Sequence, residues 1–308
     1  MDFQTSLKQT QDLLQKEFRV FFAEKNKAAG KINSLLNALV DQIADLTLRG
    51  GKRMRPFLCW MGYNIVDSSS FIVHRKITQK ELIDAMLGLE LFHSFALIHD
   101  DIIDQDKERR KGPTIHDFFN HDLRLSARLD SAKRGGKAGV ANNDLRNHFG
   151  QSVAILAGDL TLTWSDERMS YVDNPRIFQA YQQMKEQVIL GQSLDVMRQF
   201  GFADISQTKI NELKTAWYSV VWPLTIGALL ANTPQKDIFH LQRYGLLVGK
   251  AYQLRDDLMD GDITKKDFFS QTKEYKRNVE KVIDAFPADD QRKKLLSDVA
   301  AFVVMRHL

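Results

Sequence analysis

The stretch ELIDAMLGLELFHSFALIHDDIID, residues 81–104, decides how the chain is interpreted. Its apolar residues recur at spacings of three and four, which predicts a long helix over residues 79–104. The predicted apolar face consists of Leu82, Met86, Leu89, Phe92, Phe95 and Leu97. The stretch ends in three aspartates with the pattern DDxxD. In a helix the first and third of them, Asp100 and Asp104, lie one turn apart on the same face.

A second DDxxD, made of Asp256, Asp257 and Asp260, ends another apolar helical stretch over residues 236–260. Stacked like charges repel each other, and aspartate is unfavourable at the C-terminal end of a helix. One such cluster alone could be a solvated face or a cap. Two clusters favour a function, because carboxylates together with substrate phosphates are the ligands that Mg²⁺ uses in proteins. The predicted site holds a diphosphate through magnesium between the two clusters.

Composition excludes several classes of protein. Hydrophobic residues make up 44% of the 308 residues. The net charge is only +4 and the basic residues are dispersed along the chain, which argues against a nucleic-acid partner. The single cysteine, Cys59, cannot form an internal disulfide, which predicts a reducing cytoplasm. We expect no secretory signal in the polar first ten residues. The longest apolar run, residues 218–231, contains Pro223 and is too short for an integral membrane segment.

Helical periodicity covers most of the chain, and alternating strand-like patterns are scarce, so we predict an all-α protein. No long linker divides it, which favours one domain over residues 1–308. The predicted helices cover residues 2–28, 32–48, 79–104, 149–169, 174–199, 206–230, 236–260, 275–286 and 291–305. Residues from about 121 to 148 are rich in Gly, Ala, Lys and Asn, and we interpret them as a flexible surface insertion with short helical pieces.

Basic residues gather at two places near the predicted helix ends. RGGKRMRPF, residues 49–57, carries Lys52, Arg53 and Arg55 just before a proline that suits the first turn of a helix. Cations and free amides at a helix start form an anion site, although a solvated basic loop is an equal alternative. Arg109 and Arg110 follow the first acidic cluster within one loop, and arginine binds phosphate oxygens in a bidentate manner.

Three further polar residues stand on apolar helices. His93 lies two turns before Asp100 near the same face, where a lone histidine is as often a core residue as a ligand. Lys214 and Thr215 stand ahead of an apolar stretch, where they could bind phosphate or lie on the helix surface.

Seven short motifs together make the chain resemble the trans-isoprenyl diphosphate synthases of the polyprenyl synthetase family. They occur in the family's order between residues 49 and 260, and the set is far more specific than any one of them. The motifs are GGKRMRP, ELFHSFALIHDDIID, RRKGPTIH, AGDL at residues 157–160, GQSLD at 191–195, KT at 214–215 and YQLRDDLMD.

The resemblance implies a single bundle of long helices around a deep central cavity, usually in a homodimer. It implies that Mg²⁺ and the allylic diphosphate are bound by Asp100, Asp104 and Asp256, and that Asp101, Asp257 and Asp260 support these three residues. Arg109, Lys214, Thr215 and Gln253 would also serve the allylic substrate. Isopentenyl diphosphate would be held by Lys52, Arg55, His93 and Arg110.

The implied reaction is the magnesium-dependent head-to-tail condensation of isopentenyl diphosphate with an allylic diphosphate. Cations stabilise the departing diphosphate, the isopentenyl double bond attacks the allylic carbocation, and no protein nucleophile is needed. Phe95 and Ala96 stand five and four residues before Asp100, where the family sets product length. The aromatic residue resembles enzymes that stop near C20, so we expect geranylgeranyl diphosphate, with C15 or longer products as alternatives.

The chain departs from the family pattern at two places. The loop reads RRKGPT where the family has RRGxPT, so the glycine is displaced by one position. After Asp260 the sequence lacks the family's GK motif and a further lysine-bearing stretch. Either the printed sequence omits this segment or the protein lacks it; in the second case Lys265 or Lys266 could substitute, an alternative that we do not favour.

Three other functions compete with the synthase. A terpene cyclase needs no second diphosphate site, which the group of Lys52, Arg55 and His93 opposes. A non-catalytic partner subunit of a heteromeric synthase would lack the acidic clusters. A metal phosphohydrolase built on the pair His99–Asp100 would need further histidine ligands, and the eight histidines form no clear set.

Overall fold

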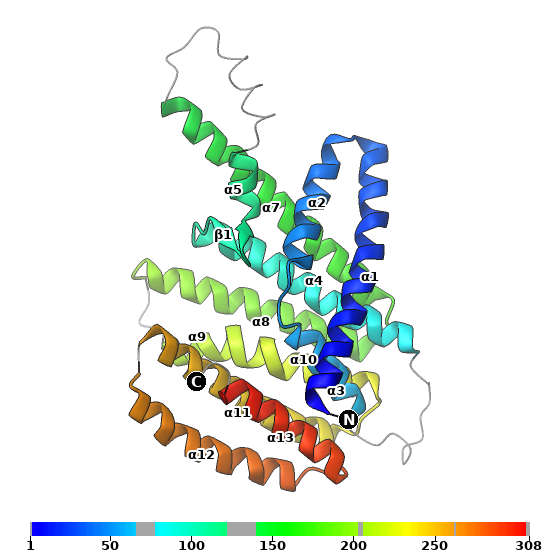
Figure 1. Ribbon diagram of the computed structural model, residues 1–308, viewed down its shortest axis with the longest axis vertical. Coiled ribbons are helices and arrows are strands. Elements are labelled where there is room, and N and C mark those ends of the chain that lie inside the picture. The colour runs from blue at the N-terminus through cyan, green and yellow to red at the C-terminus, as the bar shows by residue number, and fades with distance from the viewer. Residues whose placement is uncertain (1, 66–77, 122–139, 203–205, 262, 306–308) are drawn as a thin grey trace. The chain divides into compact units, whose positions relative to one another are not determined.

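A computed structural model describes residues 2–65, 78–121, 140–202, 206–261 and 263–305. Helices make up nearly all of the described chain (Figure 1), which confirms the all-α prediction. The elements are α1 (Phe3–Ile32), α2 (Leu35–Leu48), α3 (Met54–Asn64), α4 (Gln79–Ile103), β1 (Glu108–Arg109), β2 (Gly112–Pro113), α5 (Ile115–Asn120), α7 (Val140–Ser170), α8 (Pro175–Gln199), α9 (Gln207–Asn211), the π-helix η2 (Glu212–Val221), α10 (Trp222–Leu230), α11 (Gln235–Asp260), α12 (Lys265–Asp284) and α13 (Asp290–Met305).

The contacts between these elements group the chain into two compact units. Unit 1 comprises Met1–Gln11, Arg53–Met86 and Ser170–Leu308, and unit 2 comprises Asp12–Lys52 and Leu87–Met169. Helix α4 therefore starts in unit 1 and carries its aspartates in unit 2. The single domain and the central cavity expected from the sequence remain predictions.

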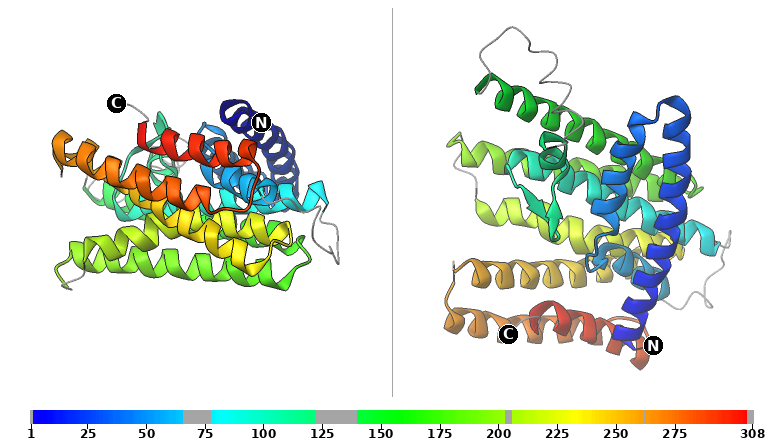
Figure 2. Two further views of the ribbon diagram at one scale, coloured as in Figure 1. Left: turned by 90° about the horizontal axis from the view of Figure 1, so that it is seen from below. Right: turned by 45° about the horizontal axis from the view of Figure 1, so that its top comes forward.

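Unit 1 is built around helix α10, all of whose residues are buried. Glycines allow α10 and α3 to approach each other closely: a Cβ added at Gly62 would lie 2.2 Å from the carbonyl oxygen of Leu224, and one at Gly227 would lie 1.9 Å from that of Cys59. Helices α11, α12 and α13 lie side by side (Figure 2), and the Tyr244 hydroxyl donates to the Leu296 carbonyl oxygen at 2.7 Å.

Unit 2 has an aromatic core between α1 and α7. The rings of Phe21 and Phe22 meet Trp164 edge to face, with centroids 5.7 and 6.1 Å apart. Hydroxyl groups connect the helices further, since Ser165 of α7 donates to the carbonyl oxygen of Gly88 in α4 at 2.6 Å. Helix α4 thereby has a fixed neighbour along the part that leads to its aspartates.

Three predicted boundaries are wrong. Helix α7 begins at Val140, so the predicted loop over 121–148 ends earlier, and residues 122–139 of it lie outside the described part. Helix α12 begins at Lys265 rather than at residue 275, because Phe268, Thr272 and Tyr275 form a buried stripe within a polar segment. The helix expected over 206–230 is divided into α9, η2 and α10.

Among the described helices, α4 alone is long and apolar enough to cross a membrane by length and composition, and the apolar run 218–231 does not qualify. In the structure 72% of the apolar window of α4 is buried inside the protein. The core helix of a folded protein passes the same test, so α4 is weak evidence for a membrane span.

Candidate active site

The first acidic cluster stands at the end of α4, as its spacing predicted. The amide of Asp104 donates to the carbonyl oxygen of Asp100 at 2.8 Å, which continues the helical ladder and stacks these two residues. Asp104 is exposed and Asp100 is partly exposed, whereas Asp101 between them is only 1% exposed. Two carboxylates can therefore reach a ligand, and the third is turned into the protein.

Asp101 is held by Arg109 from the hairpin that follows. The Arg109 Nε donates to Asp101 Oδ1 at 2.6 Å, and Arg109 Nη2 donates to Asp106 Oδ2 at 2.8 Å. Burial raises the pKa of the Asp101 carboxyl to about 6, against the opposing effect of the Arg109 charge. The other carboxylate oxygen, Oδ2, is buried without a hydrogen-bond partner. An acidic cluster with an unsatisfied buried oxygen favours a cation nearby.

The donor set fits magnesium only in part. Carboxylate oxygens are the ligands that magnesium prefers, but the described residues contain no group of three or more acidic, histidine or cysteine side chains close enough to hold a metal ion. The described carboxylates thus suit an ion that takes its remaining ligands from water and substrate phosphates.

The hairpin shows why position 112 of RRKGPT is a glycine. Arg110 and Lys111 form a two-residue turn with φ of 53° and 62°, between the paired residues Glu108–Arg109 and Gly112–Pro113. Gly112 stands beside the turn, where an added Cβ would lie 1.9 Å from Arg49 Nη1. Arg49, which the sequence did not single out, donates to the carbonyl oxygens of Arg109 at 3.0 Å and Pro113 at 2.8 Å.

Arg110 lies against the glycine loop that carries Lys52. A Cβ added at Gly51, which has a φ of +103°, would lie 2.9 Å from Arg110 Nη2. Arg110 also donates to the Leu46 carbonyl oxygen at 3.2 Å and has Glu90 at 3.9 Å. Unit 2 thus joins the RR and GGK motifs, as a shared anion site requires. Lys52 and His93 are partly exposed in the same unit.

In unit 1, Arg55 lies against the π-helix η2. Its guanidinium stands 4.1 Å from the centroid of the Tyr218 ring, and Nη2 donates to Ser219 Oγ at 2.7 Å. The Arg55 Nε is buried without a hydrogen-bond partner. Tyr218 and Ser219 are neighbours in the sequence, and a π-helix advances roughly 80° per residue against 100° in an α-helix, which brings neighbours closer to one face.

Lys214 stands on η2 and forms an ion pair with Asp195 of α8, which belongs to the GQSLD motif. Thr215 is partly exposed beside it. Helix α11 comes close to η2 at Gly249, where an added Cβ would lie 2.4 Å from the Ala216 Cα. The KT and GQSLD motifs therefore meet in unit 1, whereas the sequence left Lys214 without a partner.

The second acidic cluster is described by its backbone alone. Residues 253–260 belong to α11, which ends at Asp260, as predicted. The side chains of Gln253, Asp256, Asp257 and Asp260 lie outside the described part, so their roles remain predictions. Lys265 and Lys266 are exposed in the first turn of α12, whose N-cap Thr264 accepts from the amide of Asp267.

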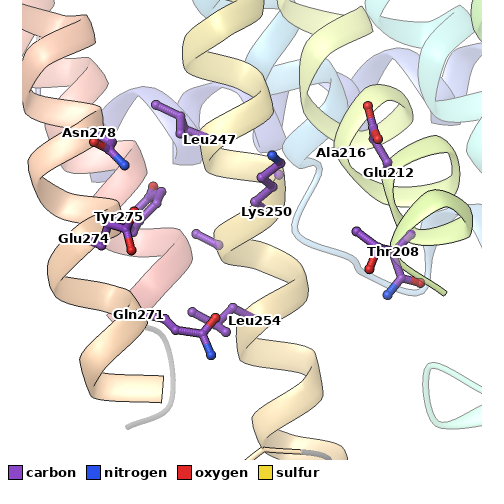
Figure 3. A pocket seen from close by; sticks show the side chains of 13 residues that line it. Thr208, Glu212, Ala216, Leu247, Lys250, Leu254, Gln271, Glu274, Tyr275 and Asn278 are labelled. Carbon is purple, nitrogen blue, oxygen red and sulfur yellow. The ribbon is translucent and has the colours of Figure 1, made fainter. Parts of the chain in front are cut away.

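A pocket of about 500 Å³ lies in unit 1 between α9, η2, α11 and α12 (Figure 3). Glu212 lines it from η2, Lys250 from α11, and Glu274 from α12. Its lining residues on α11 include Leu247, Lys250 and Leu254. At about 100° per residue the register of α11 places positions 256 and 260 on the same side of that helix as Gly249, which also lines the pocket.

The predicted chain-length residues lie on α4 in unit 2. Phe95 is buried, and its ring centroid is 5.3 Å from that of Phe92 and 4.8 Å from that of His99. Ala96 is partly exposed. The aromatic residue at position 95 is thus held between two other rings of the same helix.

Comparison with known protein families decides which family the chain belongs to. Residues 37–272 match the sequence model of the polyprenyl synthetase family. The chain belongs to this family. The match includes both acidic clusters, the RR and GGK motifs, and the KT motif on η2, and it confirms the resemblance found from the sequence.

The most similar relatives differ in the product that their names state. The chain is 26% identical to a short chain isoprenyl diphosphate synthase of Methanocaldococcus jannaschii over 82% of the chain and 68% of that protein. It is 28% identical to a (2E,6E)-farnesyl diphosphate synthase of Mycobacterium bovis over 64% of the chain and 49% of that protein. The chain therefore spans between about half and two thirds of the length of these relatives.

Solved structures show the same fold. Geranylgeranyl pyrophosphate synthase from Corynebacterium glutamicum, complexed with isoprenyl diphosphate and magnesium, has a TM-score of 0.79 over all of both chains at 23% identity. The fold and the family of prenyltransferases are thus as predicted, while the names of the relatives leave product length open.

Proposed function

We propose that the protein catalyses the head-to-tail condensation of isopentenyl diphosphate with an allylic diphosphate. The observation that carries the proposal is the arrangement around Asp101. Arg109 holds this residue inside the protein and leaves Asp100 and Asp104 toward solvent, and in the same unit Arg110 lies against the Lys52 loop. Carboxylates for a cation and guanidinium groups for phosphate oxygens are what a metal–diphosphate substrate requires.

Asp100 and Asp104, together with Asp256, would bind magnesium, which neutralises charge on the departing diphosphate. Lys214 and Thr215 of η2, with Arg109 and Gln253, bind the allylic diphosphate, and Asp101, Asp257 and Asp260 support the carboxylates that bind directly. Lys52, Arg55, His93 and Arg110 bind isopentenyl diphosphate. Fixed cations at both diphosphates favour the transition state because negative charge collects on the leaving group.

In the reaction the C–O bond of the allylic diphosphate breaks, and its electron pair leaves with the diphosphate. The double bond of isopentenyl diphosphate then forms the new C–C bond, and a proton lost from the adduct restores a double bond. The departing diphosphate is the proposed proton acceptor, since no protein base is required.

The proposed product is C20 geranylgeranyl diphosphate, and the buried Phe95 supports a product of limited length. The alternatives are a C15 or longer product, or a non-catalytic partner subunit. The proposed homodimer is supported by an exposed apolar side of α8 formed by Phe178, Ile189, Leu190 and Met197. The proposed location is the cytoplasm, which agrees with the one cysteine being free and buried.

The test is incubation with isopentenyl diphosphate and farnesyl diphosphate, with Mg²⁺ or with chelator, followed by mass analysis of the products. We expect a C20 diphosphate that requires Mg²⁺ and is lost in Asp100→Ala, while the exposed control Lys107→Gln retains it. Failure of the folded chain to extend farnesyl or any shorter primer would reject the catalytic proposal in favour of the partner subunit.

A further inference from the structure

His99 stands directly before the first aspartate cluster, yet its ring makes contacts that no metal or diphosphate role requires. The ring packs edge to face on Phe95, with centroids 4.8 Å apart and planes inclined by 65°. Its Nε2 lies 3.2 Å from the carbonyl oxygen of Ile155 in α7. A carbonyl oxygen can only accept, so the Nε2 of His99 carries the proton and donates it.

Helix α7 has a glycine, Gly158, where the His99 ring packs against it. A Cβ added at Gly158 would lie 2.1 Å from His99 Nε2 and 2.3 Å from its Cδ2, which are distances that no side chain can occupy. Gly158 has no positive φ, so close approach of the imidazole is the reason for glycine here. The AGDL motif thus provides a flat surface on α7 against which His99 rests.

The ring of Phe95 is therefore enclosed on both sides along α4. Phe92 lies one turn before it and His99 one turn after it, and His99 is itself fixed to α7 by a hydrogen bond. Aromatic neighbours of this kind restrict a ring to one orientation. A ring that stops a growing apolar chain is effective only if it cannot turn aside.

We infer that His99, seated on Gly158, is a positioning residue that fixes Phe95 and thereby sets the length of the prenyl product. This inference rests on the proposed synthase activity and on the role of Phe95 within it. His99 acts through Phe95 and does not touch the substrate.

Four variants of the full chain test the inference by product-length distribution from farnesyl diphosphate with Mg²⁺. We expect Phe95→Ala to give products longer than C20. His99→Ala and Gly158→Ala should raise the ratio of longer products to C20 by about two- to tenfold, the range that loss of one aromatic contact corresponds to. Thr163→Ala, an exposed position farther along α7, should keep the wild-type distribution.

A measurement independent of activity tests the contact itself. Gly158→Ala should lower Tm through collision with the imidazole, and the double variant Gly158→Ala with His99→Ala should regain part of that loss, because the colliding ring is gone. A double variant no more stable than Gly158→Ala would overturn the seating of His99.

The outcomes separate the inference from the proposal beneath it. If Phe95→Ala lengthens the product and His99→Ala keeps the wild-type distribution, the role of His99 is wrong and that of Phe95 stands. If Phe95→Ala changes nothing, the chain-length assignment fails, and the inference fails with it. If wild type makes no product, the proposed function itself is rejected. If Gly158→Ala does not fold, the product distribution of His99→Ala alone tests the role of His99.

Discussion

The pair of Asp101 and Arg109 predicts a particular dependence of stability on pH. Burial raises the pKa of Asp101 from 3.8 to about 6 in the folded protein, so between these values the folded state holds a proton that the unfolded state has lost. Stability therefore falls as pH rises through this window and stays lower above it. At ~1.4 kcal/mol per pH unit, the cost of ionised Asp101 reaches at most about 3 kcal/mol.

Arg109→Gln should extend this window upward. The Arg109 charge and hydrogen bond lower the pKa of Asp101, so their loss raises it beyond 6, and the fall in stability continues at higher pH. At pH 5 both proteins carry protonated Asp101, and the variant should lose only about 1 kcal/mol from the missing hydrogen bond. At pH 8 the loss should grow to about 2–3 kcal/mol, because the charge is buried unpaired or must take up a proton.

Urea unfolding at pH 5, 6, 7 and 8 measures this difference directly. The matched control is Lys107→Gln, an exposed cation of the same loop, which should stay within about 0.5 kcal/mol of wild type at every pH. A loss for Arg109→Gln that is constant across pH, or largest at pH 5, would refute the account of Asp101 as a buried carboxyl that depends on its arginine.

Three further predictions concern other parts of the chain. Tyr218→Leu removes the ring beneath Arg55 and should raise KM for isopentenyl diphosphate about three- to thirtyfold with little change in kcat. The control Tyr218→Phe keeps the ring and should stay near wild type. Equal effects of the two variants in steady-state kinetics would reject the stacking role. Gly62→Ala places a methyl group 2.2 Å from the Leu224 carbonyl oxygen, so it should lower the free energy of unfolding in urea by about 2 kcal/mol or more. An unchanged urea midpoint would contradict the close packing of α3 on α10. Leu190→Glu, at a residue 55% exposed on α8, should convert a dimer into monomers in light scattering, and a dimer that persists would place the interface elsewhere.

The sequence was sufficient where short-range spacing decides the outcome. The three- and four-residue periodicity of α4 and the DDxxD at its end predicted the stacking of Asp100 and Asp104, because both depend only on helix geometry. The same reasoning failed at the start of α12. There the buried residues Phe268, Thr272 and Tyr275 lie in a segment that is otherwise mostly polar, and Thr272 is not apolar, so the helical period was not recognised in the sequence.

The π-helix η2 could not be predicted from local sequence. Residues 212–221 mix helix-forming residues with β-branched and aromatic ones. The wider turn is contacted by Arg55 of α3 at Tyr218 and Ser219, and by Gly249 of α11 at Ala216. These contacts join segments far apart in the chain. A π-helix sacrifices regular hydrogen bonding, so it persists only where such neighbours hold it, often at functional sites.

The role of Arg109 was also beyond the sequence, for a different reason. Its spacing from Asp104 suggested a phosphate ligand, and the sequence did not predict that its guanidinium also forms an ion pair with Asp101. The hairpin turn at Arg110 and Lys111, clamped by Arg49, directs Arg109 back to α4. Because this pair keeps Asp101 in the protein, Asp100 and Asp104 are the two carboxylates of the cluster left for a cation. A DDxxD motif thus contains two kinds of aspartate, which the fold alone separates.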